Sequence, residues 1–238
     1  MSAVIIIPTI GKLCSYPAIM SALKQTYPTD IYLICDGKQF ENKFKDILNK
    51  VQHHENIGRL HTMVLPQNVG SNGFYGHRVY AAFSHLVNQD YVLFLDEDNW
   101  FETNHVESLV RVIETYSLQW SYSLRTIHNN NGFLCEDNCE SLGKWKAWTD
   151  DYHHVDTSAY CIKHDILIKI GHTWHGGWGQ DRVFYKVLSD YTNKYHTSGL
   201  HTLNYRLAGN EGSVKPDFFN IGNQKMLEKY NGIYPWNI

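Results

Sequence analysis

The first hundred residues alternate short apolar runs with amphipathic segments, and this alternation constrains the fold more than any other feature. The apolar runs, typical of strands buried on both faces of a sheet, cover residues 3–7, 31–35, 60–65 and 91–95. The segments between them, which have the apolar spacing of helices, cover residues 16–25, 40–51 and 73–88. This order predicts a Rossmann-like α/β fold with a mostly parallel central sheet and helices on both faces.

The second half of the chain has a less regular pattern. Its expected strands are residues 119–124 and 156–162, and its expected helices are 165–170, 181–188 and about 224–230. Between the two strands lies a polar, aromatic stretch, and the pattern from Gly199 onward is rich in loops. Asn104 and Glu107 have the spacing of a capping box at the start of a further helix. No repeat or linker divides the chain, so we expect a single domain over residues 1–238.

Composition excludes several classes of protein. With 43% hydrophobic and 19% charged residues, the chain is not a disordered one. A net charge of −3 argues against a protein that binds nucleic acid through its phosphates. The apolar runs are too short for a transmembrane segment. Pro8 and Gly11 interrupt the first apolar run, so it lacks the long apolar core of a signal peptide. Five cysteines without a pattern predict reduced thiols in a cytoplasmic protein.

The strongest chemical signal is the motif Asp96-Glu97-Asp98, directly after an apolar run. Side chains alternate along an extended chain, so Asp96 and Asp98 should point to one side and Glu97 to the other. Carboxylates at this spacing suit Mg²⁺ or Mn²⁺, with a diphosphate supplying further oxygen ligands. A bare motif of this kind is more often a solvated acidic turn, but its place after a buried strand favours the metal site.

A set of motifs, met in the expected order over about residues 3–190, resembles family 2 glycosyltransferases of the GT-A fold. The motifs are VIIIPT at 4–9, ALKQTYP at 22–28, ICDG at 34–37, NVG at 68–70, LFLDEDN at 93–99 and GGWGQD at 176–181. The resemblance implies a nucleotide-sugar-binding half over about residues 1–100 and an acceptor-binding half over about residues 101–238. It also implies transfer of a sugar to an acceptor hydroxyl, with inversion and with Mn²⁺ or Mg²⁺ as cofactor. A UDP-sugar is the favoured donor, with GDP- and dTDP-sugars open, and the acceptor would be a glycan or a lipid-linked molecule met at a membrane surface.

The resemblance assigns roles to residues at matching positions. Those implied to bind the nucleotide sugar are Pro8, Thr9, Asp36, Asn68, Gly70, Arg78, Asp96, Glu97 and Asp156. Asp98 would bind the metal directly, with Asp96 beside it and His201 as a candidate third ligand. Asp36 has an alternative role as a turn residue before Gly37, and Arg78 as a solvated surface arginine.

The resemblance also points to an acceptor side of the site. Asp181 would be the base that takes the proton from the acceptor hydroxyl, because it follows a glycine-rich turn and begins a helix. Trp178 would stack against a sugar face. The alternatives are an ordinary first-turn aspartate and a core tryptophan. Arg206 and Lys215 are candidates to close over the diphosphate, with residues 210–213 between them as a mobile loop.

The chain departs from the family pattern at three places. Cys35 stands where a second aspartate is common, Gly76-His77-Arg78 replaces the usual Ala-Arg-Asn, and Gln180 precedes Asp181 in place of glutamate. Two other functions therefore stay open at this point. One is a sugar nucleotidyltransferase, although the loop after the first strand has few glycines, and the other is a non-catalytic glycan-binding module.

Overall fold

The computed structural model describes residues 1–148, 152–207 and 214–237. Its first half contains the four predicted strands, as β1 (Ala3–Thr9), β2 (Thr29–Cys35), β3 (Leu60–Val64) and β4 (Tyr91–Phe94). Strand β1 lies between β2 and β4 and is parallel to both, while β2 is parallel to β3. Every residue of β1 is buried, as its run of apolar side chains predicts. The prediction of a parallel sheet is confirmed for this half.

The second half extends the same sheet with mixed pairing. The strands are β5 (Trp100–Phe101), β6 (Trp120–Asn129), β7 (Gly132–Glu136), β8 (Tyr160–Lys163) and β9 (Tyr195–Arg206). The order across the sheet is β3-β2-β1-β4-β8-β6-β9-β5, and β7 pairs with β6 as a hairpin. Strand β8 is antiparallel to β4 and to β6, whereas β6 and β9 are parallel.

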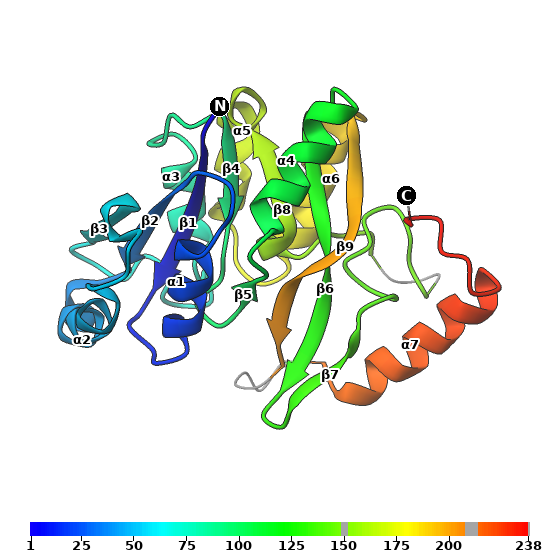
Figure 1. Ribbon diagram of the computed structural model, residues 1–238, viewed down its shortest axis with the longest axis horizontal. Helices are drawn as coiled ribbons and strands as arrows, with labels where there is room; N and C mark the ends of the chain where they lie inside the picture. The colour runs from blue at the N-terminus through cyan, green and yellow to red at the C-terminus, as the bar shows by residue number, and fades with distance from the viewer. Residues whose placement is uncertain (149–151, 208–213, 238) are drawn as a thin grey trace.

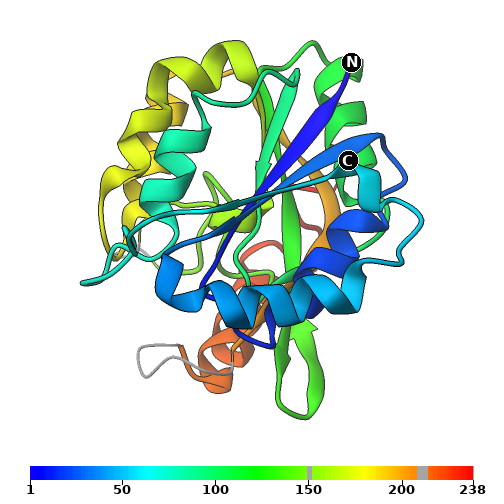
Figure 2. The same ribbon diagram turned by 90° about the vertical axis from the view of Figure 1, so that its left-hand side faces the viewer.

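The described residues form seven helices, most of which cover the two faces of the sheet. They are α1 (Ser15–Leu23), α2 (Glu41–Val51), α3 (His77–Phe83), α4 (His105–Thr115), α5 (His164–Ile170), α6 (Gln180–Tyr191) and α7 (Pro216–Lys229). In Figure 1, α1 and α4 lie in front of the sheet and α3, α5 and α6 behind it. Figure 2 shows these two layers from the side, with the strands between them. Helix α7 lies apart from both layers, beyond β7. In the described ranges, no helix has the length and apolar character needed to cross a membrane.

Four expectations about local structure are wrong. The helix expected over residues 73–88 begins only at His77, because Asn72, Gly73 and Tyr75 have positive φ angles that a helix excludes. Asn104 stands at the N-cap position of α4, but its side chain makes no capping hydrogen bond, and the Glu107 carboxylate accepts a hydrogen bond from Thr26 Oγ1.

The other two corrections lie in the second half. Asp156 does not begin a strand: its carboxylate caps a short 3₁₀ turn, Thr157–Ala159, that precedes β8. The region after Gly199, expected to be mostly loop, continues a twelve-residue strand, β9. Both errors have one cause, because the residues there have distant partners: Asp156 is paired with Arg125, and β9 pairs with β6 and β5.

Candidate functional site

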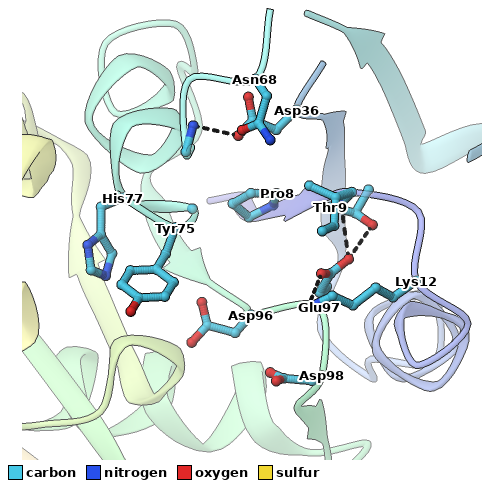
Figure 3. A pocket seen from close by; sticks show the side chains of 13 residues that line it. Pro8, Thr9, Lys12, Asp36, Asn68, Tyr75, His77, Asp96, Glu97 and Asp98 are labelled. Atoms are coloured by element: carbon cyan, nitrogen blue, oxygen red, sulfur yellow. Dashed lines mark hydrogen bonds and ion pairs between the residues drawn. The ribbon is translucent and has the colours of Figure 1, made fainter. Parts of the chain in front are cut away.

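A pocket of about 340 Å³ lies at the carboxyl ends of the parallel strands (Figure 3). Its walls come from the segments that follow β1, β2, β3 and β4, which end at the same edge of the sheet. The predicted residues that line it are Pro8, Thr9, Asp36, Asn68, Gly70, Asp96, Glu97 and Asp98. The fold therefore brings most of the predicted nucleotide-sugar site into one cavity.

Glu97 turns away from its two acidic neighbours and joins the end of β1. Its Oε2 accepts hydrogen bonds from Thr9 Oγ1 at 2.6 Å and from the backbone N–H of Ile10 at 3.1 Å. Its Oε1 lies 3.3 Å from Lys12 Nζ. In Figure 3 the carboxylates of Asp96 and Asp98 point to the opposite side of the chain, as the alternation of side chains predicts. Glu97 thus shapes the pocket by fixing the loop after β1.

Asp96 and Asp98 present acidic oxygens to a poorly solvated space. Tyr80 Oη donates a hydrogen bond to Asp96 Oδ1 at 2.8 Å, yet burial, helped by repulsion from Asp98 and Asp156, raises the pKa of Asp96 to about 8. Burial and repulsion from Glu97 also raise the pKa of Asp98. Neighbouring carboxylates with raised pKa values favour binding of a cation, because the cation removes the cost of ionising both.

The loop after β3 is held by Asp36, which is 3% exposed. The two carboxylate oxygens of Asp36 accept the backbone N–H groups of Val69 and Gly70, each at 2.8 Å. A Cβ atom on Gly70 would collide with the carbonyl oxygen of Tyr75 and lie 2.7 Å from Asp36 Oδ2, so glycine is required by this close approach. Asn68 Oδ1 is buried and has no hydrogen-bond partner in the part of the chain that the structure describes. Asn68 also lines the pocket, so this oxygen is a candidate acceptor for a bound ligand.

Four side chains that were not predicted as site residues also line the pocket: Ile10, Lys12, Tyr75 and His77. His77 Nδ1 lies 3.0 Å from the carbonyl oxygen of Gly176, and burial lowers the pKa of the imidazole. The signal for His77 was its place in the Gly76-His77-Arg78 segment that departs from the family pattern. Lys12 was detectable as a basic residue three positions beyond a strand end, whereas no local signal marks Tyr75.

Several predicted residues lie outside the pocket lining. Arg78 is exposed: its guanidinium lies 3.3 Å from the ring centroid of Phe74, and its Nη1 donates to the carbonyl oxygen of Val69 at 3.4 Å. Asp156 is buried in an ion pair with Arg125, at 2.6 Å. His201 Nδ1 lies 3.9 Å from Glu136 Oε1, and in the described residues His201 forms no three-ligand metal group with Asp96 and Asp98.

The remaining basic candidates lie on the C-terminal side. Arg206 donates from Nε to the carbonyl oxygen of Asp98 at 3.1 Å, so it lies beside the acidic motif. Lys215 immediately precedes α7. Residues 210–213, expected to form a mobile loop, lie outside the described residues.

Asp181 and Trp178 lie on the turn and helix that follow Gly176. Asp181 is in the first turn of α6, where its Oδ1 accepts the backbone N–H of Arg182 at 2.9 Å. Gly179, with φ of 78°, makes the left-handed bend that begins this helix. Trp178 is 76% exposed, so it is not a core tryptophan. The guanidinium of Arg182 lies 5.4 Å from its ring and 5.0 Å from the ring of Tyr152.

The acidic motif fits a divalent cation that takes part of its coordination from a substrate. Among the described residues, no three histidine, cysteine or acidic side chains converge in a geometry that would hold a metal alone. Asp96 and Asp98 would hold it as a pair. Mg²⁺ and related ions commonly bind to proteins through one or two carboxylates and complete their shell with substrate phosphates and water.

Comparison with known proteins identifies the family. The model of "Glycosyl transferase family 2" matches residues 5–156. Among solved structures, S. aureus TarS 1-349 in complex with UDP has a TM-score of 0.66 at 14% sequence identity, covering 96% of this chain and 65% of that one. The same protein in complex with UDP-GlcNAc has a TM-score of 0.67 at 14% identity, with coverage of 96% and 66%. The longer S. aureus TarS structure gives 0.61 at 16% identity, with coverage of 97% and 40%.

These comparisons carry different weight. No curated protein sequence matches the chain. At such low identity the likeness to TarS shows the fold, a GT-A-like α/β domain, and the chain spans only 65% of the first of these structures. The family model instead matches well over half of the sequence, including every strand that builds the pocket except part of β1. The chain therefore belongs to glycosyl transferase family 2.

Proposed function

We propose that this glycosyltransferase takes a sugar from a nucleoside diphosphate sugar, with UDP as the nucleotide, and transfers it to an acceptor hydroxyl with inversion. The observation that carries the proposal is the pocket itself. Asp96 and Asp98 face one part of it, and the buried acceptor oxygen of Asn68 lies at another, with the end of β1 between them. The UDP and UDP-GlcNAc complexes of TarS, which shares the fold, support UDP as the nucleotide.

The charge of the pocket supports a metal-dependent reaction. Its lining includes the carboxylates of Asp36, Asp96, Glu97 and Asp98, while Lys12 is the one lysine or arginine among the described lining residues. A diphosphate would be repelled by this set, so we infer that Asp96 and Asp98 bind Mn²⁺ or Mg²⁺ together with the diphosphate. When bound, the ion supplies positive charge that stabilises the departing nucleoside diphosphate.

We assign the base role to Asp181. Its carboxylate is partly buried in the first turn of α6. One oxygen is held by the N–H of Arg182, which orients the group. The other would take the proton from the acceptor hydroxyl as that hydroxyl attacks the anomeric carbon.

Trp178 extends this acceptor side. Its exposed ring and the ring of Tyr152 both lie near the guanidinium of Arg182, the residue after Asp181. Flat aromatic faces bind the apolar face of a sugar ring, so we propose that a glycan acceptor, free or lipid-linked, lies against these rings.

All five cysteines are unpaired, which supports the cytoplasmic location predicted from the sequence.

Calorimetry with UDP, GDP, dTDP and CDP, each with Mn²⁺, tests the proposal. We expect UDP to bind most tightly and its affinity to drop when Mn²⁺ is replaced by a chelator. Tighter binding of another nucleotide would show that the donor sugar is linked to that nucleotide rather than to UDP. Failure of all four nucleotides to bind in the presence of Mn²⁺ would contradict a nucleotide-sugar site in this pocket.

A further inference from the structure

Ser158 is a fully buried serine that contacts the acidic motif from behind the pocket. It belongs to the 3₁₀ turn Thr157–Ala159, between the polar stretch and β8. Its Oγ accepts the backbone N–H of Asp96 at 3.0 Å and lies 3.4 Å from Asn99 Nδ2, which also donates to it. One hydroxyl oxygen therefore holds both ends of the segment from Asp96 to Asn99.

The rest of that segment is fixed by hydrogen bonds to its backbone and to Asn99. The N–H of Asn99 donates to the carbonyl oxygen of Asp96 at 3.2 Å, which closes a turn around Glu97 and Asp98. Asn99 Oδ1 accepts the backbone N–H of Arg206 at 3.1 Å, and Arg206 Nε donates to the carbonyl oxygen of Asp98 at 3.1 Å. These contacts set the direction of the two aspartate side chains without using their carboxylates.

Ser158 is held in turn by Asp156. Asp156 Oδ1 accepts the N–H of Ser158 at 2.9 Å, and its Oδ2 accepts from Arg125 Nη1 at 2.6 Å. The N–H of Asp156 donates to Ser141 Oγ at 2.8 Å. Asp156 is 7% exposed and does not line the pocket. Its hydrogen bond holds the turn that carries Ser158, and Ser158 in turn holds the acidic motif.

Arg125 anchors this chain of contacts in the interior. The guanidinium, on a residue 3% exposed, donates from Nε to Asp137 at 2.7 Å and from Nη2 to Glu140 at 2.5 Å, besides its bond to Asp156. Its face lies 4.4 Å from the ring centroid of Tyr205. Buried ion networks of this kind stabilise a fold weakly, and in some proteins they serve to enforce one geometry.

We propose that Ser158 is a positioning residue for the carboxylate pair, and that Arg125 positions Ser158 through Asp156. The inference rests on the proposed function, since it explains how Asp96 and Asp98 are aimed at a shared cation. Ser158 itself does not line the pocket. In metal sites, the groups that orient the ligands typically change affinity by about 10- to 100-fold when they are removed.

The test compares Ser158→Ala with two matched variants. Ser158→Thr keeps the hydroxyl, and Ser121→Ala removes an equally buried hydroxyl, which donates to the carbonyl of Leu109 at 3.0 Å, away from the motif. The first readout is the calorimetric affinity for UDP with Mn²⁺. We expect Ser158→Ala to weaken it about 10-fold or more, Ser158→Thr to restore most of the loss, and Ser121→Ala to leave it unchanged.

The second readout needs no ligand. Amide hydrogen exchange at Asp96 should be faster in Ser158→Ala by about 10-fold or more, and unchanged in Ser121→Ala, because only the first loses an acceptor for that N–H. Wild-type affinity together with wild-type exchange in Ser158→Ala would overturn the inference. If wild-type protein binds no UDP, the proposed function fails, and the exchange measurement alone decides whether Ser158 positions the motif.

Discussion

His77 Nδ1 lies 3.0 Å from the carbonyl oxygen of Gly176, and this contact joins the pocket at the strand ends to the turn that leads to Asp181. The two loops are also close in their backbones, because a Cβ atom on Gly177 would lie 2.9 Å from the carbonyl oxygen of Gly73. Segments about a hundred residues apart in the sequence are therefore held together. A sugar bound in the pocket would therefore lie next to the turn that leads to Asp181.

Replacing His77 should uncouple these two loops. We expect His77→Ala to lower kcat for sugar transfer by roughly 3- to 10-fold, the worth of one hydrogen bond, with a smaller effect on UDP affinity. His77→Asn should recover part of the activity, since an amide nitrogen can replace Nδ1 as the donor to Gly176. Steady-state kinetics beside UDP calorimetry separates the two effects. Equal losses in Ala and Asn variants would show that the contact with Gly176 is not what matters.

Gly70→Ala tests the close approach in the loop that we propose lies beneath the nucleotide. The added Cβ would collide with the carbonyl oxygen of Tyr75 and press on Asp36, so the loop must open. We expect a loss of roughly 1–3 kcal/mol in the free energy of unfolding and a strong loss of UDP binding. Gly58→Ala is the control, because nothing lies within 4 Å of its Cβ position. Normal UDP binding by Gly70→Ala, measured by calorimetry, would show that this loop does not contact the nucleotide.

Asp181→Asn should separate binding from chemistry. The amide keeps the size of the side chain but cannot accept the proton, so kcat should fall by roughly 100- to 10,000-fold. UDP affinity should stay within a factor of about 2, because Asp181 does not line the pocket. Asp190→Asn, on the same helix but exposed and paired with Lys186, should have wild-type kinetics. A kcat near wild type in Asp181→Asn would assign the base role to another residue.

His105 should make the protein sensitive to acid. Burial lowers the pKa of His105 to about 3, while its ring stacks on Phe101 and Nδ1 lies 2.8 Å from Thr202 Oγ1. The unfolded chain protonates this histidine near pH 6.5 and the folded chain only near pH 3. The unfolded state therefore binds more protons in that window, and stability falls as pH falls through it, by up to about 1.4 kcal/mol per pH unit from this group.

Denaturant unfolding between pH 7 and pH 4 measures this effect. His105→Asn removes the titrating group and keeps a polar contact for Thr202, so its stability should change less with pH than that of wild type. The difference in slope between the two proteins isolates His105 from the other titrating groups. If the free energy of unfolding changes with pH equally in the two proteins, His105 is not the cause of the acid sensitivity.

The sequence predicts the first half of the fold well because each element there has a clear local pattern. Strand β1 is a continuous apolar run, and α2 has a strong amphipathic face that buries Phe44, Ile47 and Val51. The pocket follows from topology, since the polar residues after parallel strands must meet at one edge. For this reason the strand pattern alone predicts a shared site for Asp36 and Asp96, although many residues separate them in the sequence.

The second half is less predictable because its elements depend on distant partners. Strand β9 is interrupted by Gly199 and carries polar residues that pair with β6 and β5, so its sequence alone is typical of loop. Asp156 has the pattern of a site residue, but its partner is Arg125, thirty-one positions earlier. Such pairs depend on tertiary structure, and no spacing rule within one element reveals them.

The central claim is that Asp98 and a divalent cation hold the nucleoside diphosphate. Calorimetry of UDP binding, with Mn²⁺ and with a chelator, on wild type, Asp98→Asn and the exposed control Asp46→Asn tests it most directly. We predict Mn²⁺-dependent binding in wild type and in Asp46→Asn, and a loss of about 10-fold or more in Asp98→Asn that added Mn²⁺ does not restore. UDP binding that is equally tight with and without Mn²⁺, or that is unchanged in Asp98→Asn, would contradict the claim.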